Sequence, residues 1–180
     1  MPRYAALLRG INVGRHQRVA MADLRGLLSG LGYGDVRTHL QSGNAIFTSR
    51  SGNPVKLARE VEKGIEDKVG LSVRCLVWRG AELGAVLARN PFQTGATDGS
   101  KMLVLFLSEQ PDPKLLEAHN PTKLAPEQIR VGERVIYQWC PDGILAAPKV
   151  SAFVEKHLKV AVTARNWNTA TRLSVLMDEA

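Results

Sequence analysis

The sequence predicts an α+β fold of two tandem ferredoxin-like halves (β-α-β-β-α-β type) with antiparallel sheets, followed by a C-terminal helix. Two observations predict this fold. Patterns typical of a strand, a helix, a hairpin, a helix and a strand occur in that order twice along the 180 residues. A stretch rich in helix breakers, Asn90 to Ser100, separates the two series. We therefore expect an N-terminal half at residues 1–90 and a C-terminal half with the final helix at 91–180.

The elements of the first half follow from hydrophobic spacing and from helix signals. Leucines recur at helical spacing after Met21, whereas strand segments alternate or are continuously apolar. Asn53-Pro54 supplies a cap and an initial proline for a second helix, and Gly70 ends it. The expected elements are a strand at 4–8, a helix at 21–31, a hairpin of strands at 36–40 and 45–47, a helix at 54–69, a strand at 71–77 and a short helix at 81–88.

The second half repeats the order of elements without repeating the residues. Gly132-Glu133 predicts a two-residue hairpin turn with glycine first. Ser151 is the expected cap of the following helix. The expected elements are a strand at 102–107, a helix at 113–118, a hairpin of strands at 129–131 and 135–137, a helix at 151–158, a strand at 160–163 and a last helix from about 166.

Bulk composition places the chain among ordinary globular proteins. Hydrophobic residues make up 44% and charged residues 23% of the sequence. No apolar run approaches the roughly 20 residues of a membrane-spanning helix, and the run Ala5 to Leu8 is too short for a secretory signal. Cys75 and Cys140 lie far apart and form no metal or redox motif. We expect a cytoplasmic protein with no membrane partner.

The formal net charge of +7 comes from the first half alone. Residues 1–90 hold 14 Lys and Arg against 7 Asp and Glu, whereas residues 91–180 hold 10 of each. No acidic residue precedes Asp23. Such a field favours a phosphate-bearing or otherwise anionic partner, although solvated surface arginines explain it as well.

Three polar segments are the candidate site. Each combines small or amide-bearing residues with a position at the end of a predicted element, and two also carry an arginine. We expect them to converge in a cleft between the two halves and to bind a ligand there. The candidate ligand-binding residues are Arg9, Gly10 and Asn12; Gln41, Ser42 and Asn44; and Arg165, Asn166, Trp167, Asn168 and Thr169.

Two of the segments have a chemical reason to bind an anion, Gln41 favours a polar contact in the third, and all three have an ordinary structural alternative. Arg9 ends a strand expected to be central, and Gly10 lets backbone N–H groups approach a ligand. Arg165 offers a planar fork for phosphate or carboxylate ahead of the last helix, and Trp167 offers a face for stacking. The alternative is that these residues are turns, helix caps and core.

Standard catalytic and cofactor-binding motifs are absent from the sequence. Gly10 and Gly14 lack the spacing of a dinucleotide-binding loop, and no Gly-Lys-Ser/Thr phosphate loop occurs. The four histidines show no metal-ligand spacing, and no Ser or Cys lies in a nucleophile elbow. The sequence therefore assigns no catalytic residue, no metal and no cofactor, and leaves open whether the protein is an enzyme.

The chain resembles an uncharacterised bacterial family, catalogued as domain of unknown function 1697. The resemblance covers the whole chain in order and implies a two-part α/β fold without implying an activity. It is carried by Leu7 to Gly14, Met21, Leu24, Thr38, Gln41 to Asn44, Phe47, Asn90 to Phe92 and Thr163 to Thr169. Arg15 stands where the family usually has a second glycine, and Ala146-Ala147-Pro148 precedes Lys149 where a serine-lysine pair is commoner.

The sequence is compatible with two functions. The first is the binding of a small phosphorylated or nucleotide-like ligand, with or without a reaction on it. The alternative is a nucleic-acid-binding module that uses the basic N-terminal half, since ferredoxin-like sheets can present aromatic residues to single-stranded RNA. The first half has few aromatic residues, which counts against the alternative.

Overall fold

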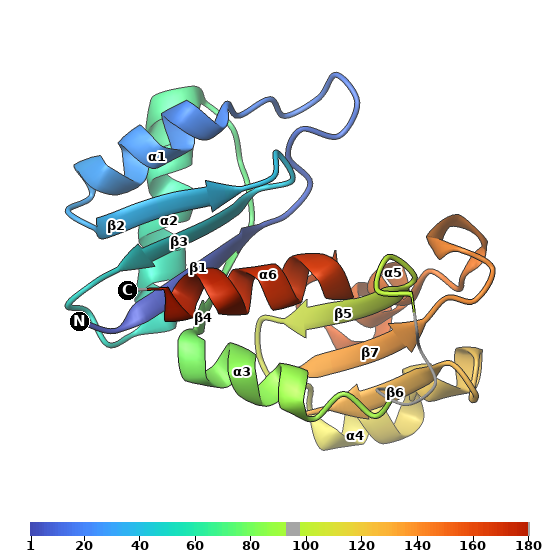
Figure 1. Cartoon of the computed structure of the whole chain (residues 1–180). Coiled ribbons are helices and arrows are strands. Elements are labelled where there is room, and N and C mark those ends of the chain that lie inside the picture. The colour runs from blue at the N-terminus through green and yellow to red at the C-terminus, as the bar shows by residue number, and fades with distance from the viewer. Residues whose placement is uncertain (93–97, 180) are drawn as a thin grey trace. The chain divides into compact units, whose positions relative to one another are not determined.

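Two four-stranded antiparallel sheets with the same strand order form the framework of the chain (Figure 1). The structure is a computed structural model that describes residues 1–92 and 98–179. The first sheet has the order β2-β3-β1-β4 and the second the order β6-β7-β5-β8. The two orders are identical when β5, β6, β7 and β8 are matched with β1, β2, β3 and β4. The predicted duplication of a ferredoxin-like unit is therefore confirmed.

The first series of elements ends in a helix beyond the fourth strand. Its elements are β1 (Arg3–Leu8), α1 (Met21–Gly30), β2 (Gly34–His39), β3 (Asn44–Thr48), α2 (Pro54–Val69), β4 (Cys75–Arg79) and α3 (Gly80–Ala88). Asn53 caps α2 by accepting hydrogen bonds from the backbone N–H groups of Val55 and Lys56, and Gly70 ends the helix in the left-handed conformation. Both ends of α2 therefore lie where the sequence predicts them.

The second series has the same order and also ends in a helix. Its strands and α-helices are β5 (Met102–Leu107), α4 (Pro113–Ala118), β6 (Ile129–Gly132), β7 (Val135–Trp139), α5 (Val150–Phe153), β8 (Val162–Asn166) and α6 (Trp167–Asp178). Short 3₁₀ segments lie at Pro121–Leu124 (η1) and Ile144–Ala146 (η2), and α5 continues as a π-helical turn, η3 (Val154–Leu158).

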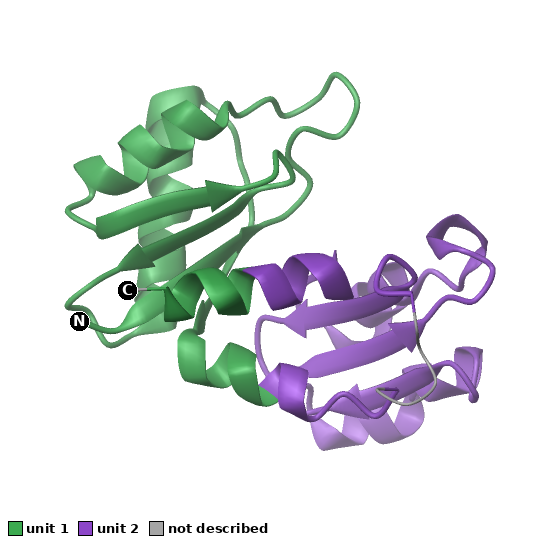
Figure 2. Cartoon of the chain, viewed as in Figure 1, with its two compact units in different colours: residues 1–85, 173–180 green, residues 86–172 purple. Residues whose placement is uncertain are grey.

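The chain divides into two compact units (Figure 2). Unit 1 comprises residues 1–85 and 173–180, and unit 2 comprises residues 86–172. Within unit 1, the Arg3 guanidinium donates to the backbone carbonyls of Met177, at 3.1 Å, and Glu179. The predicted domain boundary at residue 90 stays a prediction, and the part of the predicted linker at 93–97 lies outside the described residues.

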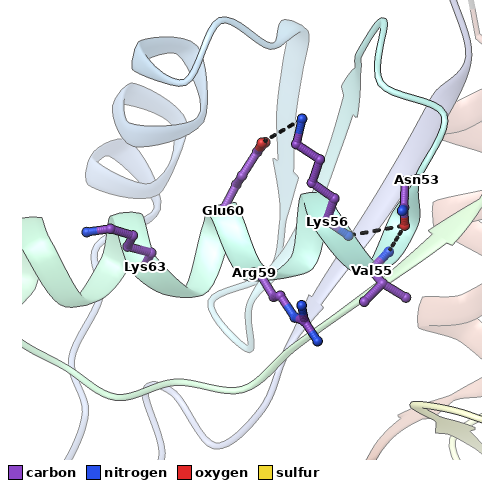
Figure 3. Close-up of a pocket in the computed structure, with 6 residues that line it drawn as sticks. All are labelled: Asn53, Val55, Lys56, Arg59, Glu60 and Lys63. Carbon is purple, nitrogen blue, oxygen red and sulfur yellow. Dashed lines mark hydrogen bonds and ion pairs between the residues drawn. The ribbon is translucent and has the colours of Figure 1, made fainter.

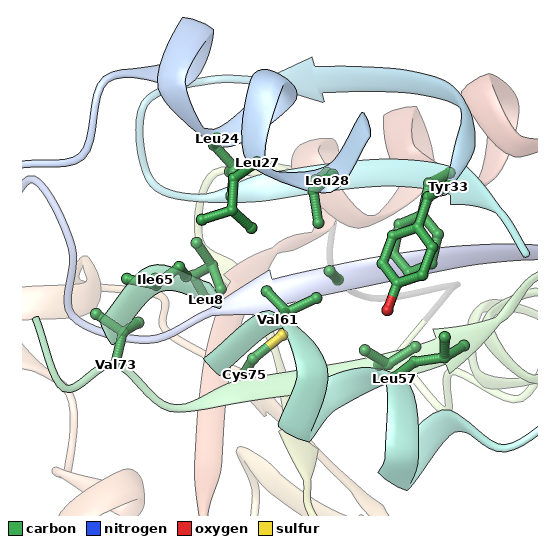
Figure 4. Packing of buried hydrophobic residues seen from close by; sticks show 14 of the residues in the cluster. Leu8, Leu24, Leu27, Leu28, Tyr33, Leu57, Val61, Ile65, Val73 and Cys75 are labelled. Atoms are coloured by element: carbon green, nitrogen blue, oxygen red, sulfur yellow. The ribbon is translucent and has the colours of Figure 1, made fainter. Parts of the chain in front are cut away.

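The core of unit 1 lies between its sheet and helices α1 and α2, which cover one face of the sheet (Figures 1 and 4). Leu57, Val61 and Ile65 recur every four residues along α2 and are fully buried. Tyr33 stacks on Phe47 of β3 with ring centroids 4.5 Å apart. Unit 2 has a smaller cluster of the same kind, made of residues from β5 to β8, α5 and η3.

Four sequence-based boundaries are wrong. Leu71 and Val73 precede β4 because the strand begins only where Cys75 pairs with Leu8, the last residue of β1. The second hairpin turns at Glu133-Arg134, with Arg134 at φ 55° and Gly132 paired to Val135.

The last two concern the segment after the second hairpin. The helix begins at Val150, so Ser151 lies inside it and is not its cap. Strand β8 starts later than expected and runs on through Arg165 and Asn166, because both residues pair with β5. Among the described residues, no helix has the length and apolar character required to cross a membrane.

Candidate functional site

One end of the first sheet gathers the six predicted site residues of unit 1. The loop between β1 and α1 (residues 9–20) and the turn between β2 and β3 (residues 40–43) meet there, and we call them together the loop cluster. The Leu8 N–H donates to the Gly43 carbonyl at 2.9 Å, and the Arg9 N–H donates to the Arg74 carbonyl at 2.9 Å. The ends of β1, β3 and β4 thus hold the loop cluster in place.

The Asn12 side chain joins the two parts of the loop cluster. Its Nδ2 donates to the carbonyl of Gln41, at 2.6 Å, and to that of Val19, at 2.8 Å. Its Oδ1 accepts from the Val19 N–H at 2.9 Å. Asn12 also has φ 55°, a left-handed conformation that asparagine tolerates better than most residues. Asn12 therefore shapes the loop cluster and uses both ends of its amide to do so.

The longer loop folds back on itself in a narrow turn. The Asn12 N–H donates to the Gln17 carbonyl at 3.0 Å, and Val13 and His16 form an isolated antiparallel bridge. Gly14, at φ 61°, lies at the tip. This arrangement leaves the side chains of Arg15, His16 and Arg18 exposed.

Gly43 and Asn44 are explained by the packing of the shorter turn. A Cβ atom on Gly43, at φ 94°, would lie 2.8 Å from side-chain atoms of Ile11 and Leu8. Asn44 is fully buried, and its Nδ2 donates to the His39 carbonyl at 2.8 Å and to Ser42 Oγ at 3.0 Å. Gln41 and Ser42 are exposed, so among these four residues they are the ones placed to meet a ligand.

Helix α1 starts at the end of the loop cluster without a capping side chain. Its N-cap is Ala20, which makes no side-chain hydrogen bond to the first turn. The first backbone N–H groups of a helix have no partner within the helix and carry its positive dipole end. Asp23 is the acidic residue of this first turn. The N–H groups and the exposed arginines of the loop before them can both bind an anion.

The second predicted group lies in unit 2, where β8 passes into α6. Arg165 is 8% exposed, and its Nη1 donates to Thr163 Oγ1 at 2.7 Å and to the Ala164 carbonyl at 2.9 Å. Asn166 Oδ1 accepts from the Thr169 N–H at 2.9 Å, which is a helix-capping bond. The capping alternative thus describes Asn166, and the Arg165 side chain has partners inside the fold.

Trp167 and Asn168 occupy the first turn of α6. Trp167 is half-buried, and its N–H donates to the Gly99 carbonyl at 3.1 Å. Asn168 is exposed, and its side chain lies so close to Gly99 that a Cβ there would meet Oδ1. Thr169 is buried. The predicted convergence of this group with the loop cluster in one cleft stays a prediction.

A basic hollow on α2 is a second place in unit 1 where an anion could lie (Figure 3). It has a volume of about 300 Å³. The Lys56 Nζ reaches towards the Glu60 carboxylate, 3.8 Å away, whereas Arg59 points to the other side of the helix (Figure 3). Glu60 also accepts from the Tyr33 hydroxyl at 2.5 Å. The basic groups of the hollow do not converge on a common point. Its lining residues are Asn53, Val55, Lys56, Arg59, Glu60 and Lys63.

Sequence reasoning missed three features of the loop cluster. It did not place Arg15 and Arg18 in the site. It also missed the uncapped start of α1, for which the signal was an alanine where Ser, Thr, Asp or Asn is preferred. No cluster of three or more His, Cys, Asp or Glu suited to a metal ion occurs in residues 1–92 and 98–179.

The fold defines a class, α+β proteins built from two ferredoxin-like halves, and in this chain the loop cluster at one end of the first sheet is basic. The chain belongs to the family described as Protein of unknown function (DUF1697), whose model matches residues 1–137. The predicted family resemblance is therefore confirmed.

A solved structure shares the fold. It is titled the structure of conserved bacterial protein SP0830 from Streptococcus pneumoniae, and it has 22% sequence identity and a TM-score of 0.68 over 98% of each chain. At this identity the likeness concerns the fold alone. No curated protein matches the chain.

Proposed function

We propose that the protein binds the phosphate groups of a small phosphorylated or nucleotide-like ligand at the loop cluster. The observation that carries the proposal is that α1 starts with no capping side chain directly after a loop that bears exposed Arg15 and Arg18. Backbone N–H groups at the start of a helix and guanidinium groups are both donors that phosphate oxygens accept from.

The charge around the loop cluster supports an anionic ligand over a neutral one. Residues 1–22 and 36–59, which supply both parts of the loop cluster, contain no Asp or Glu. An incoming anion therefore meets few carboxylates, of which Asp23 in the first turn of α1 is one. Asn12 supports the proposal indirectly, because it holds the loop shape before any ligand arrives and so lowers the ordering cost of binding.

A thermal-shift titration with pyrophosphate and with mononucleotides tests the proposal. A ligand at 100 times its Kd adds about 2.7 kcal/mol to the free energy of unfolding, so saturable stabilisation is easy to detect. We expect Arg15→Ala and Arg18→Ala each to weaken binding about tenfold, as loss of a charge-assisted hydrogen bond does.

The matched control is Arg59→Ala, which removes one positive charge, as Arg15→Ala and Arg18→Ala each do. Arg59→Ala removes an exposed arginine from the hollow on α2 and should leave the thermal shift unchanged. If Arg59→Ala abolishes the shift while Arg15→Ala does not, the phosphate binds at the hollow and the proposal fails.

A further inference from the structure

Two exposed aliphatic side chains stand at the tips of the loop cluster. Val13 is 67% exposed and Leu40 is 55% exposed. Val13 follows Asn12 in the sequence, and Leu40 precedes Gln41. The Asn12 Nδ2 donates a hydrogen bond to the Gln41 carbonyl at 2.6 Å. The two residues therefore lie at the same end of the sheet, in the loop cluster that also contains Arg15, His16 and Arg18.

Leu40 keeps this exposed position despite an unfavourable backbone. Its φ is 61°, a left-handed conformation that leucine rarely adopts. Turns that need this conformation normally use Gly, Asn or Asp. Neither the conformation nor the exposure is explained by the packing of unit 1, since Leu40 is absent from its core. Strain of this kind at an exposed side chain points to a contact outside the fold.

We infer that the nucleotide-like ligand is part of a single-stranded nucleic acid, with the arginines on its phosphates and Leu40 and Val13 against its bases. This inference rests on the proposed function, because it needs phosphate binding at the loop cluster. Single strands expose the faces of their bases to apolar side chains, whereas a duplex stacks them away.

Charge complementarity favours a polyanion over a single phosphate. The loop cluster itself, residues 9–20 and 40–43, carries Arg9, Arg15, Arg18 and His16 without any acidic residue. Gln41 and Ser42 are exposed directly after Leu40 and can donate to and accept from base edges or sugar hydroxyls. An anionic membrane fits less well, because inserting Leu40 into lipid would draw these two polar side chains out of water.

Fluorescence anisotropy with a labelled single strand of about 12 nucleotides, within the usual site sizes of such proteins, tests the inference. Inorganic polyphosphate serves as the probe for charge alone. The informative variant is Leu40→Asn, since asparagine suits the left-handed position. It should keep or raise the melting temperature, keep polyphosphate binding, and weaken strand binding at least about threefold. Leu145→Ser, a change at a leucine that is 91% exposed in unit 2, is the control and should alter neither.

The outcomes distinguish phosphate binding at the loop cluster from binding of a single strand there. Loss of polyphosphate binding in Arg15→Ala, together with weaker strand binding in Leu40→Asn, supports both. Normal strand binding in Leu40→Asn overturns the inference and leaves phosphate binding intact. Equal polyphosphate binding by Arg15→Ala and the unaltered protein overturns the proposed function. A duplex of the same sequence, and vesicles of phosphatidylserine and phosphatidylcholine, are measured in the same way. If the protein binds either of them more tightly than the single strand, the single-strand assignment is overturned.

Discussion

Asn12 combines a backbone role and a side-chain role, and two substitutions separate them. Asn12→Gly keeps the left-handed conformation but removes the bonds to Val19 and Gln41, whereas Asn12→Ala also strains the backbone. We expect the free energy of unfolding to fall by about 1–2 kcal/mol for Asn12→Gly and by roughly 1 kcal/mol more for Asn12→Ala. Urea denaturation measures both. Equal stability of Asn12→Gly and the unaltered protein would show that the amide bonds contribute nothing.

Arg165 is the residue whose expected behaviour changes most once its surroundings are known. As a ligand residue ahead of a helix, it would be dispensable for folding. Its buried guanidinium instead donates to Thr163 and to the Ala164 carbonyl. We now expect Arg165→Ala to lower the free energy of unfolding by about 1.5–3 kcal/mol, since charged hydrogen bonds are lost from a buried site. Near-normal stability, measured in urea, would return Arg165 to the ligand-binding set.

The contrast between Asn166 and Arg165 shows how far sequence reasoning reaches at this scale. An asparagine before a helix is a recognisable cap, and Asn166 does cap α6. The burial of Arg165 was not predictable, because it depends on β8 continuing to pair with β5 beyond Thr163. A pairing between distant segments leaves no signal in the local sequence pattern.

At the scale of elements, boundaries that depend on local sequence signals were predicted, and boundaries that depend on pairing between distant segments were not. Helix α2 has its cap, its first proline and its terminal glycine written in consecutive residues, so both ends were predictable. Strand β4 was expected from Leu71 but begins at Cys75, because its length is set by where β1 ends. The loop cluster likewise needed the structure, since Asn12 and Gln41 are brought together by the pairing of β1 with β3.

Helix α1 provides a prediction in which binding should improve. Asp23 places a carboxylate in the first turn, where it competes with an external anion for the helix dipole. Asp23→Asn should tighten pyrophosphate binding about two- to fivefold, equivalent to the 0.3–1 kcal/mol of such a charge, and should slightly destabilise the free protein. Isothermal titration calorimetry measures the affinity. Unchanged affinity would place the phosphate away from this helix end.

Tyr33 links the end of α1 to α2 and makes stability depend on pH in the alkaline range. Burial, followed by the hydrogen bond to Glu60, raises the Tyr33 pKa above its ordinary value of 10.0. The folded protein therefore keeps a proton that the unfolded chain loses. The stabilisation is complete below about pH 10 and is lost as the pH rises further.

The variant Tyr33→Phe isolates this effect. We expect it to lower the free energy of unfolding by about 1.5–3 kcal/mol at pH 8, because the bond to the Glu60 carboxylate is lost. The difference from the unaltered protein should begin to shrink near pH 10, the ordinary pKa of tyrosine, and should go on shrinking as the pH rises towards about 11 and beyond. A difference that stays constant over this range would mean that Tyr33 ionises as readily in the fold as in the unfolded chain.

At the scale of the whole molecule, the two halves share a fold but differ in charge. The two sheets have one strand order, yet the net charge of +7 belongs to residues 1–90. Duplication explains the shared strand order of the two sheets, whereas the basic loop cluster belongs to the first sheet. The order of elements was predictable because hydrophobic period and turn residues are local, and so was the location of the charge.

The central claim is that phosphate groups bind at the loop cluster, and amide chemical shifts measured during a pyrophosphate titration test it most directly. We predict saturable shifts that are largest for the backbone N–H groups between Gly10 and Asp23, and their loss in Arg18→Ala. Shifts that are largest between Asn53 and Lys63, along the hollow on α2, would contradict the claim, as would the absence of any saturable shift.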